Sequence, residues 1–360
     1  MKTLLAGLTM MIIFGCGQKD IESNNKLVPV IVTEQTKHDT DDPAIWINPT
    51  DPTQSLIIGT DKNEDGALYV YTLDGKIDEQ KTVRGLKRPN NVDVEYGLIL
   101  RDQSTDIAVT TERFENRLRI YRLPDMKEID NGGIDVFVGE DLRAPMGIAL
   151  YKRPSDNAIF AIVGRKEGPT DGTYLWQYQL QDDGNGNVKG LKVREFGNWS
   201  GIKEIEAIAV DDALGYVYYA DENVGIRKYF ADPDLEEANK ELALFGTNGF
   251  TDDREGISIY CVNDGTGYIL VSDQQANKFR IFTREGTIDN PHNHVLVKEI
   301  TVSTSESDGN DVTNVSLNEN FPFGLFVAMS NDKTFQLYSW QDIAGNDLKL
   351  APNGQYREDQ

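Results

Sequence analysis

The stretch from Asp39 to Trp46 carries three carboxylates immediately before the chain becomes apolar. Pro43 fixes its own φ and pushes Asp42 towards extended geometry, which predicts a turn that leads into a strand. Because clustered carboxylates repel one another, a hard cation with oxygen ligands, such as Ca²⁺, is their natural partner. The alternative is a solvated acidic turn whose Asp side chains cap the strand.

Similar carboxylates recur at turns throughout the chain. The candidate metal ligands are Asp41, Asp42, Asp93, Glu206, Glu222, Asp253, Glu255, Asp308 and Asp311. Their convergence would be strongly unfavourable without cations, so we expect several Ca²⁺ ions as cofactors. For any one of them, taken alone, the alternative is a surface turn residue.

Basic residues follow the first strand of three successive predicted hairpins. Arg binds phosphate bidentately and Lys acts as a point charge, so an arc of these residues beside bound cations suits a polyanionic phosphate substrate. The candidate substrate-binding residues are Lys62, Arg113, Arg165 and Lys166, and the candidate catalytic residues are Lys62, Arg113, Lys166, Glu167 and Glu222. A solvated turn is again the alternative for each residue singly.

Calcium in such a site would polarise phosphoryl oxygens and lower the pKa of a bound water, which would then attack phosphorus in line. No protein nucleophile is needed, and the sequence agrees by what it lacks. None of the histidines His38, His292 and His294 lies in an Arg-His-Gly motif, and Cys261 has no arginine six residues further on. We also find no Walker loop.

The elements that must position these residues are strands, because the apolar stretches beyond residue 28 are short, β-branched or aromatic and broken by Gly, Asn and Asp. Six hairpins share one form, and their starts recur about every 50 to 57 residues, as in propeller blades. They run from Ser55 to Leu73, Asp106 to Leu123, Ala158 to Leu180, Gly215 to Phe230, Gly267 to Arg284 and Phe323 to Trp340. The one helix candidate is a turn or two near residues 234–240.

A further short strand precedes each hairpin, and a fourth strand follows five of them. The preceding strands begin at Asp42, Asn90, Pro145, Ile205, Arg254 and Asn310. The unpaired strand from Val28 to Thr33 can complete the last blade and close the ring, which leaves no open sheet edge. We therefore predict an all-β fold, a six-bladed β-propeller of four-stranded antiparallel blades. The turns that enter its innermost strands gather at one end of the central channel, where the acidic and basic residues would meet.

The N-terminus predicts export. Lys2 and an apolar run from Leu4 to Phe14, too short to span a bilayer, form a signal peptide that ends at Cys16. This resembles a bacterial lipoprotein signal, with Cys16 the lipidated residue; an ordinary secretory signal is the alternative. We expect residues 1–16 to be the signal, 17–27 a tether, 28–345 the propeller and 346–360 a polar tail. The protein would then be anchored by lipid to a bacterial membrane, facing the periplasm or the cell exterior.

The charge balance excludes other partners. Asp and Glu outnumber Lys and Arg by 59 to 36, a formal net charge of −23, which argues against nucleic acid or an anionic membrane surface as partner. The only membrane contact expected is the lipid anchor. A closed propeller has no need of a partner chain, so we expect a monomer.

Several motifs together resemble the β-propeller phytases. They are the segment His38–Trp46, Asn90-Asn91-Val92-Asp93, Lys166-Glu167-Gly168, Asp253-Arg254-Glu255-Gly256 and the segment Phe321–Phe326. The resemblance implies a calcium-dependent enzyme that hydrolyses myo-inositol hexakisphosphate (phytate), as its calcium complex, at two neighbouring phosphate sites. It further implies phosphate binding by Lys62, Arg113 and Lys166, a catalytic calcium cluster on Glu206, Glu222, Asp253 and Glu255, and further calcium ligands at Asp42, Asp308 and Asp311.

Two positions depart from the pattern of that family. Asn63 stands where a second Lys is common, and Met146 stands where a Tyr is common, so each removes a phosphate or metal contact. Arg165 could replace the lost charge. Two alternatives stay open: a non-catalytic lipid-anchored propeller that binds calcium, and a propeller lactonase or esterase. The latter would need few basic residues near its metal.

Overall fold

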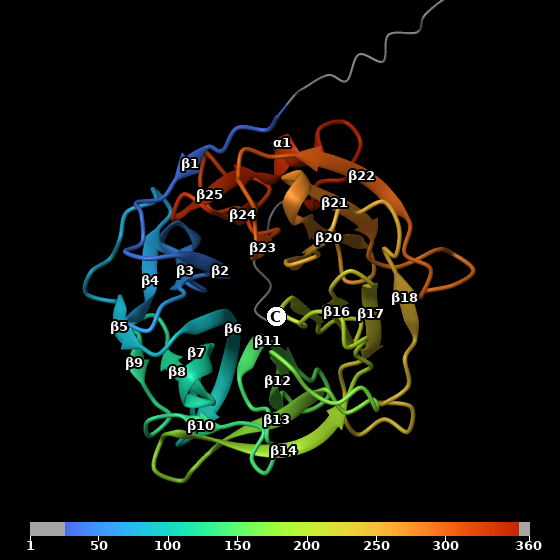
Figure 1. Cartoon of the computed structure of the whole chain (residues 1–360). Coiled ribbons are helices and arrows are strands. Elements are labelled where there is room, and N and C mark those ends of the chain that lie inside the picture. Colours follow the sequence, from blue (N-terminus) through green and yellow to red (C-terminus); the bar gives the residue numbers. More distant parts are fainter. Residues whose placement is uncertain (1–25, 353–360) are drawn as a thin grey trace, which may run out of the picture.

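Six antiparallel sheets surround a central axis in the computed structural model, which describes residues 26–352 (Figure 1). The predicted six-bladed propeller of four-stranded blades is therefore confirmed. Blade 1 holds β2 (Thr40–Trp46), β3 (Leu56–Asp61), β4 (Gly66–Thr72) and β5 (Val83–Leu86). Blade 2 holds β6 (Pro89–Leu100), β7 (Gln103–Glu112), β8 (Arg117–Arg122) and β10 (Ile134–Asp135), and β9 (Lys127–Glu128) also pairs with β8. Blade 3 holds β11 (Pro145–Lys152), β12 (Ile159–Arg165), β13 (Leu175–Asp182) and β14 (Val188–Phe196).

The remaining blades repeat the order from axis to rim. Blade 4 holds β15 (Ile208–Asp211), β16 (Tyr216–Asp221), β17 (Gly225–Phe230) and β18 (Ala243–Phe245). Blade 5 holds β19 (Ile257–Cys261), β20 (Gly267–Asp273), β21 (Lys278–Thr283) and β22 (Leu296–Thr301). Blade 6 holds β23 (Asn310–Thr313), β24 (Leu325–Ser330), β25 (Thr334–Ser339) and β1 (Ile31–Val32). In blade 6 the outer strand comes from the N-terminal side of the chain: Ile31 of β1 pairs with Leu337 of β25. Figure 1 shows β1 beside β25.

The core lies between blades, because side chains alternate across each strand. In β12 the neighbours Ile162 and Val163 are both fully buried, yet they belong to different apolar clusters, one against blade 4 and one against blade 2. A middle strand is thus covered on both faces, which explains why it is apolar throughout rather than alternating.

Two short segments differ from the prediction. Residues 234–240, where a helix was predicted, form turns, and the α-helix of the described chain is α1 (Trp340–Ala344). Packed structure also continues beyond the predicted domain end at residue 345, because Leu348 and Ala351 bury apolar side chains beside Tyr260. Residues 1–25, which include Cys16 and most of the predicted tether, lie outside the described residues, and 26–352 contain no helix long and apolar enough to cross a membrane.

The second strand of each blade ends in a buried polar residue that holds the loop entering the same blade. At the end of β3, Asp61 accepts hydrogen bonds from the backbone N–H groups of His38 and Asp39, at 3.0 and 2.7 Å. Glu112, Asp221, Asp273 and Ser330 accept equivalent bonds from the N–H groups of Lys87, Ser200, Thr251 and Ser305. Arg165 reverses the polarity and donates to the Leu142 carbonyl at 3.3 Å. These six anchors fix the loops at one end of the ring.

Candidate functional site

The residue after each anchor is the first to leave the sheet, and the six such residues differ in charge around the ring. They are Lys62, Arg113, Lys166, Glu222, Gln274 and Asn331, in blades 1 to 6. Three cations therefore lie on successive blades, followed by a carboxylate and two amides. This order places the three positive charges on one half of the ring.

Lys62 joins the carboxylates of blades 1 and 6. Its Nζ lies 2.5 Å from Asp41 Oδ1 and 3.2 Å from Asp308 Oδ2. Burial disfavours the ammonium, but Asp41, Asp308 and Glu206 outweigh that cost and raise the pKa of Lys62. Burial of Asp41, reinforced by Glu206 and Asp308, raises the pKa of that carboxyl group despite Lys62.

Two carboxylate triads share Glu222. One consists of Glu204, Glu206 and Glu222 and the other of Glu222, Asp253 and Glu255, and within each the carboxylate oxygens lie within 4.8 Å of one another. Glu222 is 1% exposed, and its Oε1 is buried without a hydrogen-bond partner in the described part of the chain. A buried carboxylate oxygen without a donor is unfavourable unless a cation or proton satisfies it. The donor set, all oxygen and formally anionic, fits a hard cation such as Ca²⁺.

Neutral amides connect the triads to Asp41 and Asp308, the two carboxylates that contact Lys62. Asn90 Nδ2 lies 3.2 Å from Asp41 Oδ2 and 3.0 Å from Glu206 Oε1. Gln274 Nε2 lies 2.6 Å from Glu255 Oε2 and 2.5 Å from Asp308 Oδ1. The structure thus brings together six of the predicted metal ligands: Asp41, Glu206, Glu222, Asp253, Glu255 and Asp308. They form one network, which we call the carboxylate cluster together with Glu204.

Asp253 is the most fully bonded member of the cluster. Its Oδ1 accepts from Asn223 Nδ2 at 2.7 Å and contacts Lys203 Nζ, and its Oδ2 accepts from Gln275 Nε2 at 2.7 Å. Lys203 therefore supplies positive charge from the loop that enters blade 4.

The other two cations of the arc flank the cluster. Lys166 Nζ contacts Glu204 Oε1. Burial and Arg88 lower the pKa of Arg113, and Glu206, Glu204 and Asp41 oppose them, so its guanidinium lies in the field of the cluster. Within residues 26–352 that guanidinium donates no hydrogen bond, which leaves it available to an anion.

Arg165 and Glu167 lie apart from this arc. Arg165 is 1% exposed; besides anchoring the Leu142 loop, it donates to the carbonyls of Thr173 and Tyr174 and its guanidinium carbon lies 4.5 Å from the centre of the Phe137 ring. It is an anchor of the fold, one residue before the position that faces the site. Glu167 is exposed and belongs to neither triad.

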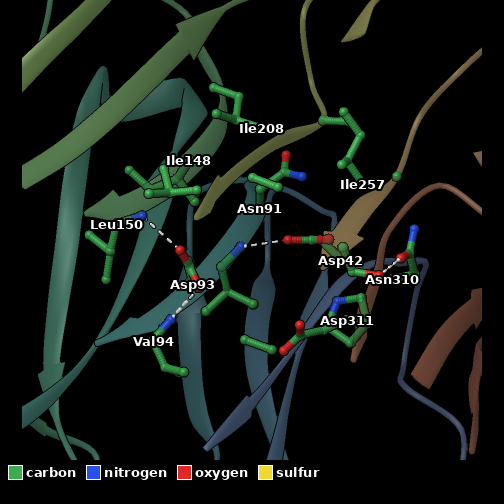
Figure 2. Close-up of a pocket in the computed structure, with 18 of the residues that line it drawn as sticks. Asp42, Asn91, Asp93, Val94, Ile148, Leu150, Ile208, Ile257, Asn310 and Asp311 are labelled. Atoms are coloured by element: carbon green, nitrogen blue, oxygen red, sulfur yellow. Dashed lines mark hydrogen bonds between the residues drawn. The ribbon is translucent and has the colours of Figure 1, made fainter. Parts of the chain in front are cut away.

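The remaining predicted metal ligands, Asp42, Asp93 and Asp311, line the axial channel, where a cavity of about 180 Å³ lies (Figure 2). Each accepts a hydrogen bond from a backbone N–H of the inner strand in the adjoining blade: Val92 to Asp42 at 3.0 Å, Leu150 to Asp93 at 2.7 Å and Ile45 to Asp311 at 2.8 Å. Burial raises the pKa of Asp93 to about 8 and of Asp311 to about 6. In the structure these carboxyl groups connect blades around the axis.

Four residues of the site were not predicted from the sequence: Glu204, Lys203, Gln274 and Gln275. Glu204 had a readable signal, since it stands two residues before Glu206 and side chains two apart on an extended chain share a face. Gln274 occupies in blade 5 the position of Lys62 in blade 1, which the repeat would have revealed. Lys203 had no such signal, because its contact with Asp253 joins two blades.

The cluster makes the metal-free protein sensitive to pH. Burial and the neighbouring Glu204 and Glu206 raise the pKa of Glu222 to about 9, and burial with Asp308 raises that of Glu255 to about 11. The ordinary pKa of a glutamate is 4.5, so above pH 4.5 the unfolded chain releases these protons. The folded protein still holds them. Stability therefore falls as pH rises through this window. We expect the Tm in chelator to decrease steadily from pH 5 to 9.

The control for this prediction is Glu222→Gln, which should reduce the slope, since one of the titrating groups is removed. Calcium should lessen the decrease in the wild-type protein, because it neutralises the ionised carboxylates. A Tm in chelator that stays constant between pH 5 and 9 would contradict the assignment. Differential scanning calorimetry across that range measures all three.

Comparison with known proteins by sequence points to one family, and comparison by structure gives the fold alone. Residues 16–348 match the family described as Phytase. The chain is 31% identical over 324 residues to a 3-phytase of Bacillus subtilis (strain 168), with 84% of this chain and 80% of the relative covered. A solved structure of a luciferin-regenerating enzyme, 14% identical, superposes with a TM-score of 0.52 over 91% of this chain and all of its own, a likeness of fold alone.

Proposed function

The chain belongs to the phytase family of phosphoric monoester hydrolases, and on that premise we propose that it hydrolyses the phosphate monoesters of phytate in a calcium-dependent reaction. The observation that carries the proposal is the position of the carboxylate cluster beside the cations Lys62, Arg113 and Lys166. A polyphosphate ester needs both halves of such a site, cations for its oxygens and carboxylates to hold divalent metal.

Calcium would be held by the two triads, Glu204, Glu206, Glu222, Asp253 and Glu255. The buried Glu222 Oε1, which lacks a donor in the described chain, supports this assignment. Bound calcium supplies positive charge that polarises phosphoryl oxygens and lowers the pKa of water at the site. Without cations the same carboxylates would repel phosphate, so metal and substrate binding are coupled.

The protein's own cations bind and orient the substrate. Arg113, whose guanidinium has no partner in residues 26–352, is placed for bidentate contact with one phosphate. Lys62 and Lys166 approach from the neighbouring blades, so a ring that carries several phosphates can contact more than one of them. The departures at Asn63 and Met146 remove contacts that are common in the family, and Arg165 does not replace them because it is buried as an anchor. We therefore propose binding through fewer protein cations and more metal.

We also propose that the protein is exported and anchored by a lipid at Cys16, facing the periplasm or the cell exterior. The support is the sequence of residues 1–16, a short apolar run ending in Gly-Cys. We also propose that the protein is a monomer. The support is that each blade, including blade 6 with β1, already has its outer strand. Mass spectrometry of Cys16 in the membrane fraction tests the anchor.

The test of the proposed function is a comparison of substrates with the protein lacking residues 1–16, in calcium at neutral pH. We expect phosphate release from phytate and no hydrolysis of a lactone or a carboxylic ester. Lactone or ester hydrolysis without phosphate release would replace the proposal by a propeller lactonase or esterase. Binding of calcium without turnover of any of these substrates, by folded protein, would favour a non-catalytic propeller.

A further inference from the structure

Lys203 is a cation of the site that does not belong to the arc of Lys62, Arg113 and Lys166. It also does not lie at the end of a strand, as those three residues do. It lies in the loop that enters blade 4, held there by a hydrogen bond from Trp199 Nε1 to the Lys203 carbonyl. From this loop its ammonium reaches across to Asp253, in the loop that enters blade 5. The side chain of Lys203 is 38% exposed and that of Asp253 is 7% exposed, so the lysine is the more accessible partner of the pair.

The three side-chain donors of Asp253 differ in charge. Asn223 and Gln275 contact this carboxylate through neutral amides, which are compatible with a cation nearby. Lys203 contacts it through an ammonium, which repels a divalent cation on Asp253, Glu222 and Glu255. Of the three donors, Lys203 is therefore the one that a divalent cation would displace.

A phosphate bound at the cluster is within the region that the displaced ammonium can reach. Among the surrounding acidic groups, Glu222 and Asp253 attract it less once metal neutralises them, whereas the exposed Asp252, which belongs to neither triad, still attracts it. Once cations occupy the triad, a phosphate bound beside them would bring new negative charge into the site. Because Lys62, Arg113 and Lys166 come from blades 1 to 3, Lys203 would contact the substrate from the opposite side of the cluster.

We propose that Lys203 is a substrate-binding residue that exchanges Asp253 for a phosphate oxygen when the carboxylate cluster binds its cation. The proposal rests on the proposed function. It makes Lys203 a competitor of calcium in the absence of substrate and a determinant of specificity for esters with more than one phosphate. A monophosphate ester held by the arc would not reach it.

The experiment compares Lys203→Gln and Lys203→Arg with wild type and with a control, Lys240→Gln, which removes an exposed lysine paired with Glu237. Calcium affinity is measured by isothermal titration calorimetry, and KM and kcat are measured for phytate and for p-nitrophenyl phosphate. In Lys203→Gln we expect calcium to bind several-fold more tightly and KM for phytate to rise about tenfold, the effect of one charge-assisted hydrogen bond. The KM for p-nitrophenyl phosphate should change much less than the KM for phytate, Lys240→Gln should leave kcat and both KM values unchanged, and Lys203→Arg should restore the KM for phytate.

Two results would overturn the proposal. Weaker or unchanged calcium binding by Lys203→Gln would mean that Lys203 does not compete with metal, and an unchanged KM for phytate in active protein would mean that it does not touch substrate. Failure of wild type to release phosphate is a different result, since it refutes the proposed function. The calcium titration then still decides whether Lys203 competes with metal.

Discussion

Replacing Glu222 by Gln is expected to lower phytate turnover by about 10²–10³-fold while leaving the metal-free fold intact. Glu222 is the one carboxylate shared by both triads, so its loss removes a ligand from each. Gln keeps the volume and one acceptor oxygen but not the charge, and calcium affinity should fall with activity. Calorimetric titration with calcium and steady-state phosphate release measure the two effects.

The stability of the same variant distinguishes a functional role from a structural one. In metal-free protein the buried carboxyl group of Glu222 has an unpaired oxygen and a raised pKa, so its removal should leave Tm at neutral pH unchanged or higher. Wild type, in contrast, should gain more Tm from calcium than the variant does. A variant that unfolds in chelator, or one that keeps wild-type turnover, would show that Glu222 is not a metal ligand of the reaction.

Replacing Lys62 by Met is expected to lower both stability and turnover. Its ammonium satisfies Asp41 and Asp308, both largely buried, and removing one partner of such a group costs about 3 kcal/mol of the free energy of unfolding in metal-free protein. Turnover should fall about 100-fold, because a phosphate contact is lost as well. Urea denaturation in chelator and phosphate release in calcium are the measurements.

Lys37→Met is the matched control. It breaks a lysine–aspartate pair with Asp65 whose side chains are 57% and 64% exposed, so the loss should stay below about 0.5 kcal/mol. Calcium should restore part of the stability of Lys62→Met, by neutralising Asp41 and Asp308, without restoring turnover. If Lys62→Met behaves like Lys37→Met in both assays, Lys62 is a surface lysine and the cationic arc loses its first member.

The fold was predictable because a propeller repeats one local pattern. Each hairpin can be recognised from its own two apolar strands and the charged turn between them, and the six repeats give the number of blades. The predicted helix at 234–240 is absent for the same reason that short helices are hard to predict: a segment of this length depends on packing rather than on its own propensity. The buried Leu348 and Ala351 were hidden within a polar sequence.

The site was predictable where position along a strand decides direction, and less so where adjacent residues diverge. The side chain of Asp41 contacts Lys62 in the carboxylate cluster, whereas that of its neighbour Asp42 accepts a hydrogen bond from the N–H of Val92 in the axial channel. Arg165 and Lys166 diverge in the same way, one anchoring a loop and the other facing the site. Both results follow from the two-residue period of extended chain, but only once the register is known.

The measurement that tests the account most directly is phosphate release from phytate by protein lacking residues 1–16, first in calcium, then in excess chelator, then with calcium restored. The carboxylate cluster and the cations form one site only if metal is needed to make the cluster attractive to phosphate. We expect release in calcium, none in chelator and recovery when calcium is returned. Equal release in chelator, or no release in calcium from folded protein, would contradict it.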